Sequence, residues 1–158
     1  MIEELDINSP STRRSIAIIV ASFLITFILS RLMVYLVLGH YLPNFFLTIK
    51  GVHIHHFTYG VVVLVVVGLY MILRRPKADT KKFFYMTMIY GIGLGLTFDE
   101  FGMWVRLEDD YWMRQSYDAI IIVTLLLLNV AYYKTLISVL NMFFKTITWP
   151  VKKIRKHL

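Results

Sequence analysis

The chain has 158 residues, of which 58% are apolar and 17% charged, and its mean hydropathy is +0.64. A typical soluble domain is less apolar and more highly charged, so these values exclude an ordinary soluble domain and indicate a multi-pass membrane protein. The absence of cysteine excludes disulfides, thiolate-bound metals and a cysteine nucleophile. The net charge of +7 requires no nucleic-acid partner, because anionic lipid headgroups are sufficient to account for it.

Four apolar runs follow a polar segment at residues 1–14, which we expect to stay outside the bilayer. The runs cover residues 15–38, 57–73, 83–103 and 117–133. The second is rich in valine, but a lone strand in lipid leaves its backbone groups unpaired, so a helix is expected there too. Residues 15–133 are therefore predicted to form a four-span domain.

The pattern changes beyond Lys134, where apolar residues recur at helical spacing and polar residues share the opposite face. We expect residues 134–158 to form an amphipathic helix on the membrane surface, followed by a basic tail. The predicted fold class is all-α: a membrane-embedded four-helix bundle with a C-terminal amphipathic interfacial helix.

The basic residues predict the orientation. With the N-terminus inside, thirteen fall on the inner side and three on the outer side. The inner ones are Arg13, Arg14, Arg74, Arg75, Lys77, Lys81, Lys82, Lys134, Lys145, Lys152, Lys153, Arg155 and Lys156, and the outer ones are Lys50, Arg106 and Arg114. This bias predicts that both termini are cytoplasmic in a prokaryotic plasma membrane, and that the inner rim attracts anionic headgroups.

Charged residues also lie within the predicted spans. Arg31 and Asp99 each lie 16 residues into a span that starts on the inner side. At about 1.5 Å per residue both are roughly 24 Å from the inner interface, hence at one depth in the outer third of the bilayer. Such side chains are costly in lipid, so Arg31 is expected to pair with Asp99 or Glu100.

Several histidines and acids gather at the same outer end, and imidazole with carboxylate is a donor set for Zn²⁺, Fe²⁺ or Mn²⁺. The predicted ligands are His53, His55, His56, Asp99 and Glu100. His53 and His56 share a helix face if the second span begins near Val52, whereas His53 and His55 share a side if the segment is extended. Arg31 would serve as counter-charge, and Asp110 and Asp118 as supporting acids.

Two other functions fit the same residues. The charges can form a structural ion-pair network in a scaffold or accessory subunit. Alternatively, they can serve a proton- or ion-coupled carrier, for which a homodimer or a larger membrane complex is expected. If the chain is an enzyme, a metal-activated water would support hydrolysis. Gly91, Gly93 and Gly95 lie in an apolar run with no preceding strand, so they indicate close helix packing and not a nucleotide site.

Three segments carry a resemblance to a known group of proteins. They read HIHHFTYG at residues 53–60, GIGLGLTFDE at 91–100 and DYWMRQSYD at 110–118. Together they resemble a group of small prokaryotic multi-pass membrane proteins of unassigned activity, over roughly residues 53–129. The resemblance implies a multi-span fold in which these three segments belong together.

Overall fold

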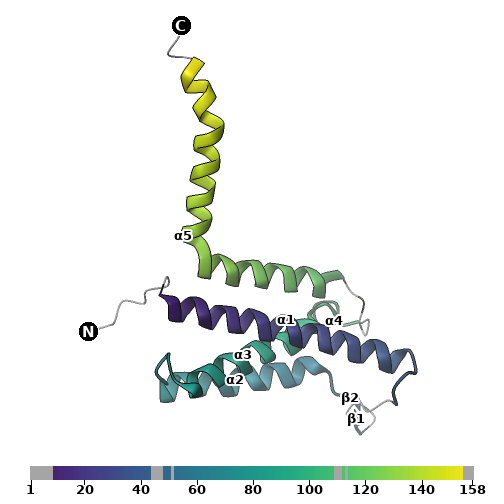
Figure 1. The fold of residues 1–158 in the computed structure, drawn as a ribbon. Helices are drawn as coiled ribbons and strands as arrows, with labels where there is room; N and C mark the ends of the chain where they lie inside the picture. Colours follow the sequence, from purple (N-terminus) through teal and green to yellow (C-terminus); the bar gives the residue numbers. More distant parts are fainter. Residues whose placement is uncertain (1–8, 44–47, 51, 109–111, 113, 155–158) are drawn as a thin grey trace.

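The computed structural model describes residues 9–43, 48–50, 52–108, 112 and 114–154, which fold into helices and one short strand pair (Figure 1). The elements in chain order are α1 (Pro10–Leu38), β1 (Thr48–Ile49), β2 (Val52–His53), α2 (His56–Arg74), α3 (Lys81–Asp99), α4 (Phe101–Arg106) and α5 (Arg114–Ile154).

Three segments of the described chain are long and apolar enough to cross a bilayer as helices, which indicates a membrane protein. They are Pro10–Leu38, His56–Arg74 and residues Arg114–Thr135 of α5. Helix α3, which covers most of the third predicted span, is not among them. Its three glycines, two threonines and terminal Asp99 lower its apolarity.

Helix α3 is the centre of the bundle and packs against both α1 and α2. Its glycines allow this close approach. A Cβ built on Gly95 would lie 2.9 Å from the Phe23 carbonyl oxygen of α1, and one built on Gly91 would lie 2.6 Å from the carbonyl oxygen of Ile19. Side chains larger than hydrogen would therefore push α1 and α3 apart.

Local signals explain where α1 and α3 begin and where α2 ends. The side chain of Ser9 caps α1 by accepting a hydrogen bond from the Thr12 amide, and Pro10 follows at the first helical position. The side chain of Thr80 caps α3 in the same way through the Phe83 amide. Helix α2 ends at Arg74, and its C-cap Arg75 has a left-handed backbone.

The third apolar run, expected as one helix over residues 83–103, is divided in two. Helix α3 ends at Asp99, and Glu100 has φ −104° and ψ 15°, outside the helical range. The short α4 then begins at Phe101. The break is supported from α5, because the buried Ser116 hydroxyl accepts a hydrogen bond from the Gly102 amide at 2.9 Å.

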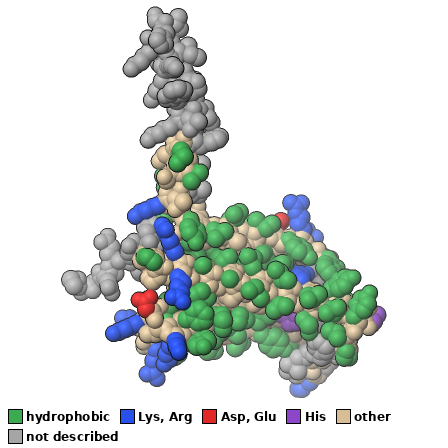
Figure 2. All heavy atoms as spheres, in the orientation of Figure 1, with side chains coloured by type: hydrophobic (Ala, Val, Ile, Leu, Met, Phe, Trp, Pro, Cys, Tyr) green, Lys and Arg blue, Asp and Glu red, His purple; other side chains and the backbone are tan. Residues whose placement is uncertain are grey.

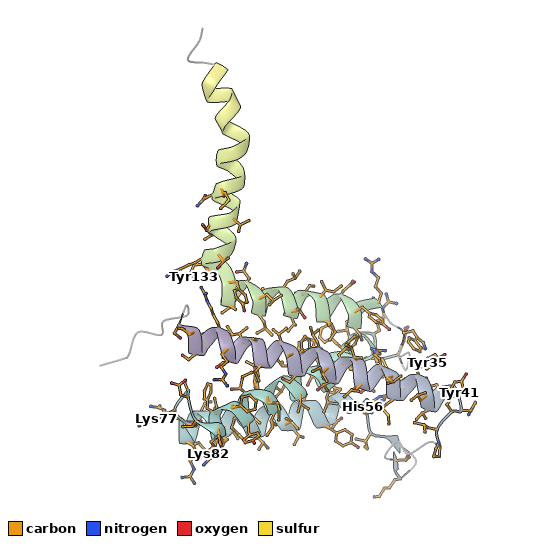
Figure 3. The ribbon with its side chains drawn as sticks, in the orientation of Figure 1. Tyr35, Tyr41, His56, Lys77, Lys82 and Tyr133 are labelled. Atoms are coloured by element: carbon orange, nitrogen blue, oxygen red, sulfur yellow. The ribbon has the colours of Figure 1, made fainter. Side chains whose placement is uncertain are left out.

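Helix α5 changes direction near the predicted end of the fourth run. Tyr132 has a non-helical backbone with φ −127° and ψ 15°. The first part of α5 runs alongside α1, and the part beyond the bend runs across the axis of the other helices (Figure 1). Tyr133, labelled in Figure 3, lies at this bend.

The segment before α2 is extended and not helical. Strands β1 and β2 pair antiparallel, with Thr48 opposite His53 and Ile49 opposite Val52. Helix α2 consequently begins at His56, with His55 as its N-cap. A helix that starts near Val52 and places His53 and His56 on one face is therefore wrong, because the hairpin already uses these backbone groups.

The surface divides into an apolar band and a basic end. Apolar side chains cover the sides of the bundle, and Lys and Arg gather where α1 begins and α2 turns into α3 (Figure 2). Lys77 and Lys82 lie at this basic end, whereas Tyr35 and Tyr41 lie at the opposite end (Figure 3). This is the distribution expected when a bilayer surrounds the middle of the bundle.

Candidate functional site

Arg31 of α1 and Asp99 of α3 form an ion pair in the interior of the bundle, as predicted. The Arg31 Nε lies 2.6 Å from the Asp99 Oδ1, and a terminal nitrogen of Arg31 donates to the Asp99 carbonyl oxygen. The Asp99 side chain is fully buried and that of Arg31 is 10% exposed. The guanidinium also lies against the rings of Phe27 and Tyr117, at 5.5 and 5.2 Å from their centroids.

Glu100, the next residue, turns its carboxylate toward the start of α2. Its Oε2 accepts a hydrogen bond from the Phe57 amide at 2.9 Å. This amide belongs to the first turn of α2, where backbone N–H groups have no partner within the helix. Glu100 is only 1% exposed. The break after α3 therefore serves to direct a buried carboxylate into the start of a neighbouring helix.

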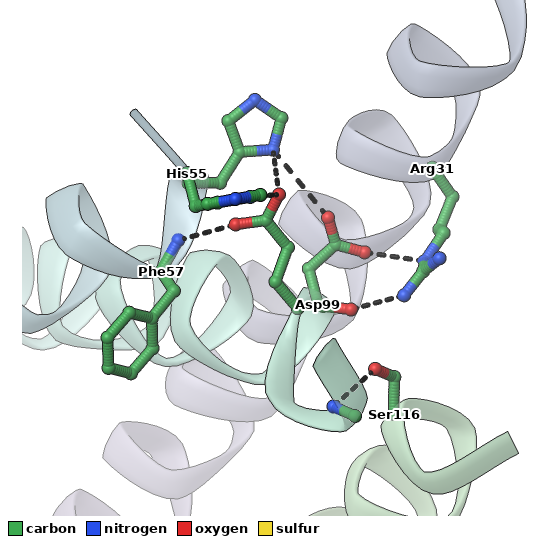
Figure 4. A network of polar contacts seen from close by, with 8 residues as sticks. Arg31, His55, Phe57, Asp99 and Ser116 are labelled. Atoms are coloured by element: carbon green, nitrogen blue, oxygen red, sulfur yellow. Dashed lines mark hydrogen bonds and ion pairs between the residues drawn. The ribbon is translucent and has the colours of Figure 1, made fainter. Parts of the chain in front are cut away.

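Two imidazoles complete the cluster (Figure 4). The His55 Nδ1 lies 3.3 Å from the Glu100 Oε1. The His56 Nδ1 lies 3.7 Å from the Asp99 Oδ2 and 3.9 Å from the Glu100 Oε1. We call Arg31, His55, His56, Asp99 and Glu100 the outer cluster, a name that refers only to their position away from the basic end of the bundle. It joins α1, the start of α2 and the end of α3.

A cleft of about 340 Å³ opens beside the outer cluster. Glu100 and His55 line it together with Phe57 and Trp104, whose rings stack at 5.5 Å between centroids. The His55 side chain is 35% exposed, so it lies between the buried carboxylate and the outside. The cleft gives a ligand a path to Glu100.

The structure brings together four of the five predicted ligands, His55, His56, Asp99 and Glu100, with Arg31 beside them. The side chain of His53 and the whole of Asp110 lie outside the described residues. Asp118 is not at the cluster. It pairs on the surface of α5 with Arg114, where Nε and Oδ2 are 3.3 Å apart and the side chains are 87% and 50% exposed.

Three contributions could not be read from the sequence. The Phe57 amide is a backbone group, so the identity of residue 57 does not indicate its hydrogen bond to Glu100. By residue type alone Trp104 is one of several aromatic residues near the charged segment after the third run, but it forms part of the cleft wall. By position alone Ser116 is a candidate helix cap beside Asp118, whereas its hydroxyl accepts a hydrogen bond from the Gly102 amide in α4. Of these three contributions only that of Ser116 had a sequence signal, because this serine lies between a charged segment and an apolar run.

The donors of the outer cluster are those of a metal site, but they are not in ligating positions. Within the described parts of the chain, no group of three or more His, Asp or Glu side chains is arranged so that it could hold a metal ion. Two ligands at about 2.1 Å from a tetrahedral Zn²⁺ lie about 3.4 Å apart. The His55–Glu100 separation matches this value, while the two His56 separations exceed it by a few tenths of an ångström.

Comparisons with family models, curated proteins and solved structures find no match to this chain. The functional conclusion therefore rests on the geometry of the outer cluster and its cleft.

Proposed function

We propose that the chain is a four-span membrane protein in which α3 is the additional span. Its 19 residues extend about 28 Å, close to the thickness of a bilayer core, and it lies between two helices that are themselves apolar enough to cross. Its lower apolarity is compatible with this position, because α1 and α2 shield it from lipid. The segment of α5 beyond Tyr132 then lies in the plane of the inner interface.

The sidedness follows from the basic end, which we place on the cytoplasmic side of a prokaryotic plasma membrane, with both termini. Because the chain has no cysteine, single cysteines report on topology directly. A membrane-impermeant maleimide applied to intact cells should label Lys50→Cys at once. It should label Lys77→Cys only after the cells are made permeable. The reverse pattern would refute this orientation.

We propose that the outer cluster binds a cation, with a divalent transition metal as the expected occupant. The observation that carries this is a charge imbalance. Asp99 and Glu100 are 0% and 1% exposed, and the guanidinium of Arg31 is bound to Asp99. Arg31 supplies one positive charge against these two carboxylates, so a second positive charge, on a bound ion or on a protonated imidazole, is needed to balance the cluster where a buried charge costs several kcal/mol.

The types of donor atom support a metal in this role. The His55 Nδ1 lies 3.3 Å from the Glu100 Oε1, and the His56 Nδ1 lies 3.7 and 3.9 Å from the Asp99 Oδ2 and the Glu100 Oε1, so side chains of the cluster must rearrange to ligate an ion. The Asp99 Oδ1 forms the ion pair with Arg31, and the Asp99 Oδ2 is the oxygen that faces His56. Zn²⁺, Fe²⁺ and Mn²⁺ all accept this mixture of nitrogen and oxygen ligands.

The test is elemental analysis of protein purified without chelators, comparing wild type with Glu100→Gln and Glu108→Gln. Both substitutions remove one carboxylate that lines the cleft, but Glu108 is exposed, and among the described residues no ion pair joins it to an imidazole. We expect about one equivalent of metal in wild type and in Glu108→Gln, and a loss of at least tenfold in Glu100→Gln. Wild type without stoichiometric metal, or equal retention in both variants, would overturn the metal assignment.

A second candidate function is a scaffold in which the outer cluster only fixes the helices. The contacts of Arg31 with Asp99, and of the Phe57 amide with Glu100, favour it because they connect α1, α2 and α3 directly. A scaffold predicts that the stability lost by neutralising either Arg31 or Asp99 is recovered when both are neutralised. It also predicts no dependence of stability on added metal.

A further inference from the structure

A second cleft, of about 330 Å³, lies at the basic end of the bundle, between the start of α1 and the start of α3. Its polar lining includes Arg14, Asp79 and Lys81. On α1 this cleft extends to Ile18, 13 residues before Arg31. At about 1.5 Å per residue the two sites are about 20 Å apart along the helix, so this one is independent of the outer cluster.

The charge of this cleft favours an anion. Arg14 and Lys81 are exposed, and in the described part of the chain no ion pair joins either of them to Asp79. Further exposed cations lie in the segment that joins α2 to α3 and at the ends of these helices, namely Arg74, Arg75, Lys77 and Lys82. The starts of α1 and α3 both lie at the cleft, and their backbone N–H groups add positive potential to that of the side chains.

The hydroxyl groups of the lining are largely committed. The Ser15 hydroxyl donates to the Ser11 carbonyl at 2.9 Å, and the Thr80 hydroxyl donates to the Lys77 carbonyl at 2.7 Å. An anion in the cleft would therefore be held by Arg14 and Lys81. Arginine and lysine are both common partners of phosphate oxygens, arginine through two parallel hydrogen bonds and lysine as a point charge.

The remaining lining is apolar. Ile18 lies one helical turn beyond Arg14, and Phe83 and Phe84 follow Lys81 on α3. Phe84 is 37% exposed, so the apolar wall continues to the outer surface of the bundle. A ligand that fits has a negatively charged head beside a hydrophobic chain, and its head lies at the level of the basic rim.

We propose that this cleft binds the phosphate headgroup of an anionic phospholipid, with an acyl chain along Ile18 and Phe84. The recognised chemistry is a phosphate group, which a soluble phosphate also carries, and the apolar wall assigns the site to the lipid. The proposal goes beyond a general attraction of the basic rim to the membrane, because it places one headgroup between two named cations.

Native mass spectrometry of the full chain in detergent tests the proposal, with phosphatidylglycerol and phosphatidylcholine of equal chain length as probes. We expect wild type to bind phosphatidylglycerol at least tenfold more tightly than phosphatidylcholine. The double variant Arg14→Gln/Lys81→Gln should bind it about 30-fold more weakly than wild type. The control Arg74→Gln/Lys77→Gln removes the same charge outside the cleft lining and should change affinity less than about threefold.

Two further measurements separate the outcomes. Arg14→Lys/Lys81→Arg retains both charges and should keep most of the lipid affinity, which shows that losses in the glutamine variant do not reflect misfolding. Millimolar inorganic phosphate should compete poorly with the lipid. Equal losses in the cleft and control variants would overturn the site in favour of diffuse attraction. Equal binding of inorganic phosphate and lipid would overturn the assignment to a phospholipid.

Discussion

The contact between Arg31 and Asp99 makes the sharpest prediction about stability. Arg31→Met removes the ion pair at 2.6 Å and also the hydrogen bond to the Asp99 carbonyl. It leaves Asp99 and Glu100 as adjacent buried carboxylates without their guanidinium. Asp99→Asn removes only the ion pair, and Arg31 keeps the carbonyl and the rings of Phe27 and Tyr117.

These differences set the magnitudes. Breaking a buried pair from one side costs about 3–5 kcal/mol, and we expect Arg31→Met to lie in this range. A hydrogen bond to a charged group is worth about 1.5–3 kcal/mol, so Asp99→Asn should cost about 2 kcal/mol. In the double variant the unpaired charges disappear together, and a coupling free energy of about 2 kcal/mol is expected.

Reversible unfolding in mixed micelles, followed by circular dichroism, measures all four corners of this cycle. The surface pair of Arg114 and Asp118 provides the control, because its exposed side chains should couple by less than about 0.5 kcal/mol. If the coupling free energy of Arg31 with Asp99 were also below about 0.5 kcal/mol, the inference that this buried pair stabilises the fold would be refuted. A larger loss from Asp99→Asn than from Arg31→Met would refute it as well.

Two further predictions concern the packing of two glycines of α2 and a buried hydrogen bond between α4 and α5. A Cβ on Gly60 would lie 2.6 Å from the Thr97 backbone nitrogen, so Gly60→Ala should cost about 2 kcal/mol. Gly68 meets no atom within 4 Å, so Gly68→Ala should stabilise by up to about 1 kcal/mol, and equal melting shifts in the two variants would contradict the observed packing. Ser116→Ala leaves the buried Gly102 amide unpaired and should cost about 1–3 kcal/mol; unchanged hydrogen exchange in α4 would argue against this contact.

The sequence predicted much of the helical layout because apolar runs and charge bias are local signals. It placed Arg31 and Asp99 at one depth from their spacing alone, and they meet. The runs also predicted a fourth membrane span, but α3 is less apolar than the helices that shield it. Hydropathy therefore could not distinguish a helix that faces lipid from one that faces protein.

The arrangement of the outer cluster depends on contacts between segments far apart in the chain. Periodicity left open whether the residues before α2 were helical or extended, and the pairing of Thr48 with His53 decided for the extended form. The end of α3 at Asp99 was hidden inside an apolar run, because Glu100 leaves the helix to meet the Phe57 amide, 43 residues earlier. No pattern within a window of one helix reports such a partner.

By itself, the sequence determined which long segments are helical and apolar, which end is basic, and that His55, His56, Asp99 and Glu100 lie toward the other end. These properties follow from residue type and spacing along one helix. Only the tertiary structure decided that Glu100 faces His55 in a cleft, that Arg31 is bound to Asp99, and that Asp118 belongs to a surface pair. Those outcomes depend on how neighbouring helices share buried charges and unpaired backbone groups, which local pattern does not encode.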